Sequence, residues 1–326
     1  MTAPAISYDD ILSAARQIKG VAVRTPLYES PALNDRIGGR VFIKLENLQQ
    51  TGAFKFRGAY NRLSRLNEDE KAAGVVAFSS GNHAQGVARA AQMLGIKATI
   101  VMPHDAPPLK VERTRGFGAE VVIYDRYKED REAVARSVAS DSGAVIVPPF
   151  NNEYVMAGQG TAGLEIAEDL NALGVVPDQV LVNCGGGGLA SGIFTAMYHH
   201  FPEVQGYAVE PETMDDVKRS LETGTRQVID PDARSICDAL LTQSPGELTF
   251  SVLQHLGIKG LTVSDDDALK TVGYAARELK LVGEPGGVVS LAALLSGKMS
   301  GRDKVSVCII SGGNIDPALL KQCLDL

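Results

Sequence analysis

Cysteine is scarce and tryptophan is absent from this 326-residue sequence. The four cysteines lie far apart and form no Cys-x-x-Cys pair, which argues against a zinc site or a disulfide framework. The N-terminus also lacks the basic and apolar regions of a secretion signal. We therefore expect a cytoplasmic protein whose cysteines are reduced and buried.

Long apolar runs and basic clusters are lacking too. No apolar stretch reaches the roughly 18 residues that a membrane helix needs. The 32 Lys and Arg residues are outnumbered by 39 Asp and Glu residues, so the net charge is −7. An acidic chain without a basic run does not suit nucleic acid or an anionic membrane. We therefore expect neither of these partners, and the length allows about two domains.

Glycine, by contrast, is abundant, with 34 residues that follow no Gly-X-Y period. Short apolar segments alternate with amphipathic segments along the chain, which is typical of parallel strands covered by helices on both faces. The sequence thus predicts an α/β fold with an open, mainly parallel sheet. The predicted strands cover residues 41–45, 75–78, 98–102, 121–124, 145–147, 180–183, 206–209 and 305–310, and the main predicted helices cover 8–18, 84–94, 129–139, 162–170, 265–279 and 289–295.

The largest glycine cluster follows the predicted strand 180–183. Gly185–Gly188 come just before Leu189 and a helix, so that successive backbone N–H groups would face a ligand at a helix N-terminus. This arrangement predicts a phosphate-binding loop. It is neither a Gly-x-Gly-x-x-Gly fingerprint with a following acid nor a P-loop, because no Gly-Lys-Ser/Thr follows. A flexible turn is the alternative.

Two further predicted strands end in small polar residues, and the carboxyl ends of parallel strands are where such folds bind ligands. Ser79, Ser80, Asn82 and His83 follow the second predicted strand. Ser311 begins a Ser-Gly-Gly-Asn segment after the last one. Both segments are candidate binding sites, although Ser and Asn also cap helices at such places.

A fourth segment contains a lysine between two aromatic residues. Lys55 stands between Phe54 and Phe56. An apolar surrounding disfavours the ammonium form and lowers the pKa of a lysine, which an amine nucleophile requires. The segment therefore makes Lys55 a candidate nucleophile, with an ordinary surface lysine as the alternative.

Together these four segments resemble the fold-type II family of pyridoxal-phosphate enzymes, and within it the serine/threonine dehydratases and serine racemases. The likeness extends from Tyr8 to about Leu320. It implies a tryptophan synthase β-subunit-like fold with two open, mainly parallel, twisted sheets and flanking helices. The implied cofactor is pyridoxal 5′-phosphate, with its phosphate on the glycines. The implied cofactor-binding residues are Phe54, Lys55, Asn82, Gly185, Gly186, Gly187, Gly188, Leu189 and Ser311.

The resemblance also implies individual roles. Lys55 carries the cofactor covalently, Phe54 packs on the cofactor ring, and Asn82 contacts the ring hydroxyl. Ser311 faces the pyridine nitrogen, and Ser80 stands as a second catalytic residue on the ring face opposite the lysine. The implied substrate-binding residues are Ser79, Ser80, Asn82 and His83.

The layout implied by the resemblance has two domains. A small domain, residues 51–147, is inserted into a large cofactor-binding domain formed by residues 1–50 and 148–326. The chain stops shortly after Asn314, so we expect no C-terminal regulatory domain. Because relatives are usually homodimers, a homodimer is expected here too.

An acidic segment after the predicted strand 206–209 resembles the divalent cation site of the same family. The likeness implies that Glu210, Asp216 and the carbonyl of Met214 bind Mg²⁺ or Ca²⁺, and hard oxygen ligands suit these ions. The alternative is a solvated acidic turn at the start of a helix, where negative side chains are favourable.

The implied reaction is the β-elimination of water from threonine or serine, which yields a 2-oxo acid and ammonia. In it, Lys55 takes the Cα proton. The neutral Ser311 limits the electron-withdrawing power of the ring and so favours elimination over transamination. A hydroxyl at Ser80 would also permit racemisation. A serine racemase, a hydroxyaspartate dehydratase and a dehydratase of ectoine breakdown are alternatives with the same motifs.

Two alternatives come from other functional classes. A non-catalytic protein that binds a phosphorylated ligand would explain the glycines but leave Lys55 and Ser311 without a role. A nicotinamide-linked oxidoreductase needs an acid on the ribose about 20 residues after the loop. Glu203 has that spacing but lies before the next predicted strand rather than at its end.

Overall fold

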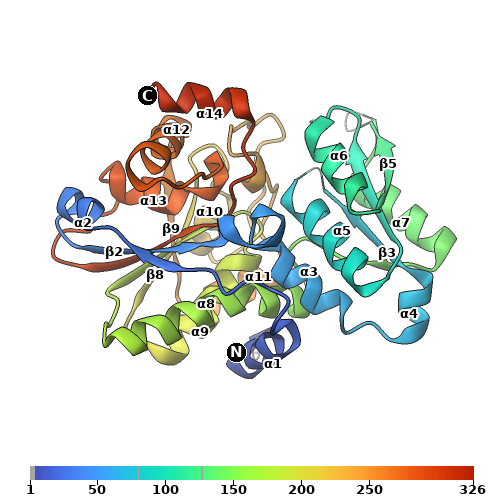
Figure 1. Ribbon diagram of the computed structural model, residues 1–326, viewed down its shortest axis with the longest axis horizontal. Coiled ribbons are helices and arrows are strands. Elements are labelled where there is room, and N and C mark those ends of the chain that lie inside the picture. Colours follow the sequence, from blue (N-terminus) through green and yellow to red (C-terminus); the bar gives the residue numbers. More distant parts are fainter. Residues whose placement is uncertain (1–3, 80, 107, 126–127) are drawn as a thin grey trace.

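The computed structural model describes residues 4–79, 81–106, 108–125 and 128–326. Its strands form two separate sheets, and helices flank both of them (Figure 1). The strands are β1 Leu27–Glu29, β2 Arg40–Leu45, β3 Val75–Phe78, β4 Ala98–Pro103, β5 Glu120–Tyr124, β6 Val145–Ile146, β7 Gln179–Asn183, β8 Gln205–Pro211, β9 Lys259–Val263 and β10 Val305–Ile310.

The helices fill the intervals between these strands. They are α1 Tyr8–Ile18, α2 Pro31–Ile37, α3 Lys55–Leu63, α4 Glu68–Ala73, α5 Asn82–Leu94, α6 Pro108–Gly116, α7 Arg131–Ser142, α8 Glu153–Leu173, α9 Gly188–His200, α10 Asp216–Thr223, α11 Glu247–His255, α12 Asp265–Tyr274, α13 Val289–Leu295 and α14 Pro317–Leu324. In the described parts of the chain, no helix has both the length and the apolar character needed to cross a bilayer.

The larger sheet has six strands in the order β1-β2-β10-β7-β8-β9, and the smaller has four in the order β5-β4-β3-β6. Every neighbouring pair is parallel except β1 and β2. The two open, mainly parallel sheets with flanking helices predicted from the sequence are thus confirmed. The chain enters the small sheet after β2 and returns to the large one after β6, while the exact domain limits at 50/51 and 147/148 stay a prediction.

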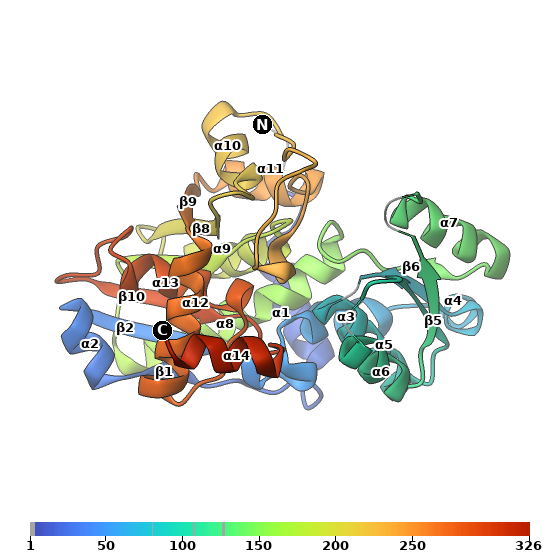
Figure 2. The same ribbon diagram turned by 90° about the horizontal axis from the view of Figure 1, so that it is seen from above.

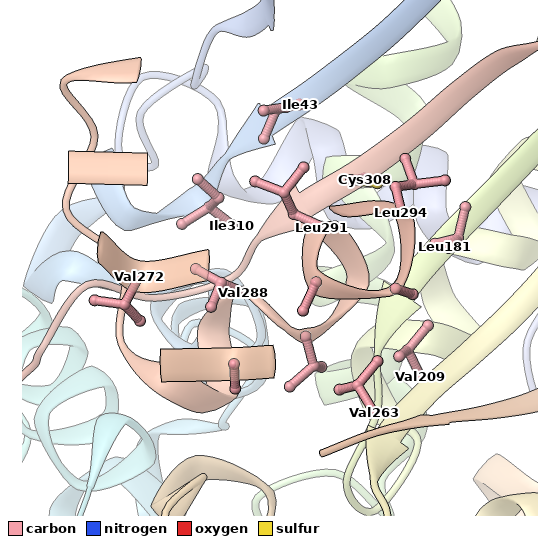
Figure 3. Close-up of a cluster of buried hydrophobic side chains, with 14 of the residues drawn as sticks. Ile43, Leu181, Val209, Val263, Val272, Val288, Leu291, Leu294, Cys308 and Ile310 are labelled. Atoms are coloured by element: carbon pink, nitrogen blue, oxygen red, sulfur yellow. The ribbon is translucent and has the colours of Figure 1, made fainter. Parts of the chain in front are cut away.

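The large sheet is covered on both faces. Alternate residues of its strands point to opposite sides, as the two-residue period of a strand requires. On one side Ile43, Leu181 and Cys308 meet α12 and α13, which Figure 3 shows through Val272 and Leu291. The opposite side packs on α8 and α9. Strands buried on both faces need apolar residues throughout, which is why they could be recognised in the sequence.

The small sheet is covered in the same way. Residues of α3 and α5 pack on one face in a single buried cluster, and α7 packs on the other. In the two views at right angles, this group of elements lies beside the large sheet and its helices (Figures 1 and 2). An isolated bridge between Ala53 and Gly312 joins the start of α3 to the segment after β10. Residues just after β3, β7 and β10 line one cavity, so the carboxyl ends of these strands face a common region.

Candidate active site

A cavity of about 230 Å³ lies between the two sheets, at the carboxyl ends of their strands. Its wall combines the start of α3, the segment after β3, the glycine loop after β7 and the segment after β10. The predicted site residues that line it are Phe54, Lys55, Ser79, Asn82, His83, Gly185, Gly186, Gly187, Gly188, Leu189 and Ser311. The predicted catalytic residue Ser80 lies outside the described residues.

Lys55 is the first residue of α3, and its amine is buried in this wall. Burial lowers the pKa of Lys55 to about 8. Its Nζ donates a hydrogen bond of 2.9 Å to the carbonyl of Pro149 and lies 5.0 Å from the ring centroid of Phe54. The ring of Phe56 packs instead in the core of the small sheet. Burial of the amine in the cavity wall, rather than a pair of flanking rings, therefore lowers its pKa.

A buried ion network holds this end of α3 in place. Arg57, two residues after Lys55, donates to Glu46 at 2.8 Å and to Glu165 at 2.7 Å. Lys44 also pairs with Glu165, at 2.6 Å. The two acids neutralise the two cations, and each charge has hydrogen-bonded partners, which a buried charge requires. The network fixes the helix that carries Lys55 to β2 and α8.

The glycine loop contains Gly185–Gly188 and leads into α9. Within the described chain, the N–H groups of Gly185 and Gly186 donate to no protein acceptor, and those of Gly188 and Leu189 belong to the free first turn of the helix. These donors line the cavity together with the positive end of a 13-residue helix. The loop has the form of an anion-binding site.

Glycine is required in this loop for a steric reason that could not be predicted from the sequence. A Cβ atom at Gly186 would lie 2.4 Å from the ring of Phe150, and one at Gly188 would lie 2.6 Å from Gln159. Gly187 has a φ of +90°, in the left-handed region where side chains are strained. The side chains packed behind the loop thus exclude larger residues, while the N–H groups face the cavity.

A neighbouring hydroxyl extends the anion-binding side of the cavity. Thr242 lines it close to Gly185, and its buried Oγ1 has no hydrogen-bond partner. A buried hydroxyl without a partner is costly, and a bound acceptor would satisfy it. Thr242 could not be predicted from the sequence, because a lone threonine in a loop carries no motif.

Asn82 is held in one orientation by two polar neighbours. Its Nδ2 donates to Glu284 Oε1 at 2.5 Å, and its Oδ1 accepts from Asn314 Nδ2 at 2.8 Å. One Nδ2 hydrogen remains for a ligand. Glu284 is buried, which raises its pKa to about 7, and the charge of Asp238 acts in the same direction. The predicted alternative role of Asn82, capping α5, does not occur, because the cap residue is Gly81.

Ser311 lies beside Lys55 in space, although 256 positions separate them in the chain. The carbonyl of Ser311 accepts from the N–H of Phe54 at 3.1 Å. Its hydroxyl oxygen accepts from Asn183 Nδ2 at 2.9 Å. With its oxygen engaged in this way, Ser311 can donate its own hydrogen toward the cavity.

His83 is neutral in this surrounding. Burial, and after it the charge of Lys55, lower the pKa of His83 to about 3. Its Nε2 lies 2.8 Å from the carbonyl of Val147, which can only accept, so Nε2 carries the hydrogen and the unpartnered Nδ1 is an acceptor. Ser79 Oγ accepts from the N–H of Gly81 at 3.1 Å, which leaves its hydrogen free.

The predicted metal residues lie away from this cavity. Glu210 and Asp216 are both buried, and Met214 lies between them in the chain. Glu210 accepts from the N–H groups of Val217 and Lys218, whereas neither carboxylate oxygen of Asp216 has a partner. Burial raises the pKa of both acids. In the described residues, no group of three or more His, Cys, Asp or Glu side chains is arranged around one point.

Comparison with known proteins agrees with this geometry. Residues 18–312 match the family described as "Pyridoxal-phosphate dependent enzyme". The chain belongs to this family. The amine of a buried lysine opposite an anion-binding loop suits a cofactor that carries both an aldehyde and a phosphate, so the cavity fits pyridoxal phosphate.

Relatives within the pyridoxal-phosphate dependent family share nearly the whole chain. A protein of Pseudomonas sp named L-threo-3-hydroxyaspartate ammonia-lyase is 46% identical over 95% of this chain and 96% of its own. The serine racemase of Schizosaccharomyces pombe is 44% identical over 95% of this chain and 94% of its own. The solved maize serine racemase is 35% identical, covers 98% of this chain and 97% of its own, and has a TM-score of 0.91.

Proposed function

We propose that this enzyme removes water from a β-hydroxy amino acid of the threonine and serine class and yields a 2-oxo acid and ammonia. The observation that carries the proposal is the pairing, in one cavity, of a buried lysine amine with the neutral hydroxyl of Ser311. The family membership and the ammonia-lyases among its relatives support it.

In this proposal, several residues hold pyridoxal phosphate. Lys55 attaches it, and the phosphate lies on the N–H groups of Gly185–Leu189 with Thr242 beside them. Asn82 offers its free Nδ2 hydrogen to the ring hydroxyl, and Ser311 offers its hydroxyl hydrogen to the ring nitrogen. Phe54 packs on the ring. The bound cofactor stabilises negative charge at the substrate Cα by spreading it into the ring.

The chain's own groups would perform the rest of the reaction. The free Lys55 amine, whose lowered pKa leaves part of it neutral near pH 7, accepts the proton from Cα. The Cβ–O bond breaks, and the hydroxyl group takes up the proton that Lys55 removed and leaves as water. The released enamine then takes up water and frees ammonia. Hydrogens of Ser79 and of the first turn of α5 bind the substrate carboxylate, and His83 Nδ1 accepts a hydrogen from the substrate.

We also infer that Glu210, Asp216 and the Met214 carbonyl bind Mg²⁺ or Ca²⁺. Two buried carboxylates next to each other, one of them without any hydrogen-bond donor, support this inference, because such oxygens need a cation. The second catalytic role of Ser80, the homodimer and the cytoplasmic location stay predictions. Gel filtration of the purified protein tests the dimer.

The function is tested by measuring 2-oxo acid release from the L and D forms of serine and threonine and from the 3-hydroxyaspartates. We expect release from at least one of them by the holoenzyme, none by Lys55→Ala, and normal release by the surface control Lys97→Ala. A Lys55→Ala enzyme that keeps wild-type release would overturn the proposal. D-serine formed from L-serine without release would instead favour the racemase alternative.

A further inference from the structure

An arginine outside the predicted site also faces the cavity. Arg131, the first residue of α7, lines it together with Lys55 and Asn82. Its guanidinium carbon lies 5.7 Å from the ring centroid of Phe78, the last residue of β3. Because Ser79 follows Phe78 directly, the guanidinium lies against the segment that binds substrate in the proposed function.

Among the cationic side chains in the described part of the cavity wall, Arg131 is the one without a polar partner. Lys55 donates to Pro149, and Lys110 pairs with Asp238, which also lines the cavity. The remaining wall carboxylate, Glu284, accepts from Asn82. In the described part of the chain, Arg131 has neither a hydrogen bond nor an ion pair, and its guanidinium lies over the Phe78 ring. An arginine stays charged at any physiological pH, so this charge is free for a ligand.

The other anions of the reaction already have donors. The glycine loop and Thr242 provide for the cofactor phosphate. The start of α5 and Ser79 provide for the substrate α-carboxylate. Besides its hydroxyl group, the Cβ atom of serine carries only hydrogens and that of threonine carries a methyl group. Neither substituent offers the Arg131 guanidinium a hydrogen-bond acceptor. A carboxylate on the substrate side chain does, because guanidinium and carboxylate form two parallel hydrogen bonds.

We propose that Arg131 binds a carboxylate on the substrate side chain and that the preferred substrate is therefore a dicarboxylic β-hydroxy amino acid, 3-hydroxyaspartate. This inference rests on the proposed function. The reaction stays balanced: the Cα–H and Cβ–O bonds break, water leaves, and hydrolysis of the enamine gives oxaloacetate and ammonia. Arg131 adds binding and selectivity to this reaction and carries out none of the bond changes.

Steady-state kinetics of wild type and Arg131→Gln on 3-hydroxyaspartate, L-threonine and L-serine test the proposal. We expect wild type to favour 3-hydroxyaspartate. In Arg131→Gln, the ratio of kcat/KM for 3-hydroxyaspartate over kcat/KM for threonine should fall about 10- to 100-fold, the range for one charge-assisted pair. Arg131→Lys, which keeps a charge, should recover part of the ratio. Arg136→Gln, on the same helix but paired with Asp130 and Glu132, is the matched control.

Binding measurements test the role of Arg131 separately from the proposed elimination reaction. Succinate should protect the wild-type holoenzyme against thermal unfolding more than butyrate does, and Arg131→Gln should remove the difference. An equal fall of kcat/KM for all three substrates would place Arg131 on the shared α-carboxylate and overturn the inference, as would a wild type that favours threonine or serine. An enzyme that releases no 2-oxo acid from any substrate but still prefers succinate would contradict the proposed function alone.

Discussion

Asn183 donates a hydrogen bond of 2.9 Å from its Nδ2 to the Oγ of Ser311. Asn183 is itself fixed at the end of β7, where Nδ2 also contacts the carbonyls of Gly287 and Ile309 and Oδ1 accepts from the N–H of Ser290. The side chain therefore cannot rotate to offer Ser311 an acceptor. Ser311 is left as a neutral group whose hydroxyl hydrogen is available to a ligand in the cavity.

A carboxylate at this position should change the outcome of the reaction. In Ser311→Asp, an ionised side chain would hold a proton on the ring nitrogen and strengthen the ring as an electron sink. We expect 2-oxo acid release to fall at least about tenfold, the scale of one hydrogen bond to a charged group. Ser311→Ala, which stays neutral, is the control, and its 2-oxo acid release should fall less than that of Ser311→Asp. Equal or faster release by Ser311→Asp would show that neutrality at this position does not matter.

The lowered pKa of Lys55 predicts how the apoenzyme takes up its cofactor. Only the neutral amine can attack the aldehyde, so the uptake rate should rise about tenfold per pH unit and level off above about pH 8, rather than near the value of about 10.4 for a free lysine. Stopped-flow absorbance between pH 6 and 10 measures this rate. Lys97→Ala should follow the same curve, and Lys55→Ala should give no bound absorbance band. A rate that still climbs at pH 10 would contradict the burial of the amine.

Removal of the central cation of the ion network should destabilise the fold. Arg57→Ala leaves Glu46 buried without its cation, and we expect the free energy of unfolding to drop by about 3–5 kcal/mol. Arg62→Ala, on the same helix and with no ion pair to any described residue, should lower the free energy of unfolding by less than that. Urea denaturation measures both variants. If the two losses are equal, the network contributes no more than an ordinary helix position.

Divalent cations should stabilise the protein through Asp216. A cation that binds the folded state alone raises the free energy of unfolding by about 2.7 kcal/mol at 100 times its Kd. Thermal unfolding with Mg²⁺, with Ca²⁺ and with EDTA should show a higher Tm with either ion in wild type and no response in Asp216→Asn. Asp215→Asn, whose carboxylate pairs with Arg219 instead, should respond normally. An unchanged wild-type Tm would remove the proposed metal site.

The elements that could be predicted with their limits are those that one local sequence pattern determines. The buried strands 75–78 and 305–310 and the helices 8–18 and 289–295 occur with the predicted limits, because apolar runs and caps are local signals. The edge strands β1 and β9 were not predicted, since a half-exposed strand mixes polar and apolar residues. The predicted helix 265–279 is α12 followed by a π-helical turn that ends at Lys280 with a φ of +61°.

Only the site residues that belong to sequence motifs could be predicted. Gly185–Gly188 and Lys55 stand out in the chain, and the structure brings them to one cavity. The contact of Glu284 with Asn82 depends on tertiary packing and has no signal in the sequence. The same holds for Arg131 at the start of α7 and for Thr242 in a loop, which reach the cavity from distant parts of the chain and carry no local signal.

The most direct test of the central claim is the stoichiometry of the products. Ammonia and 2-oxo acid should be measured together while the holoenzyme consumes its best substrate among 3-hydroxyaspartate, threonine and serine, with no amino-group acceptor added. β-Elimination predicts one ammonia for each 2-oxo acid over many turnovers. A 2-oxo acid that appears without ammonia and stops after one equivalent of enzyme would mean that the amino group stays on the cofactor, and that result would contradict the account.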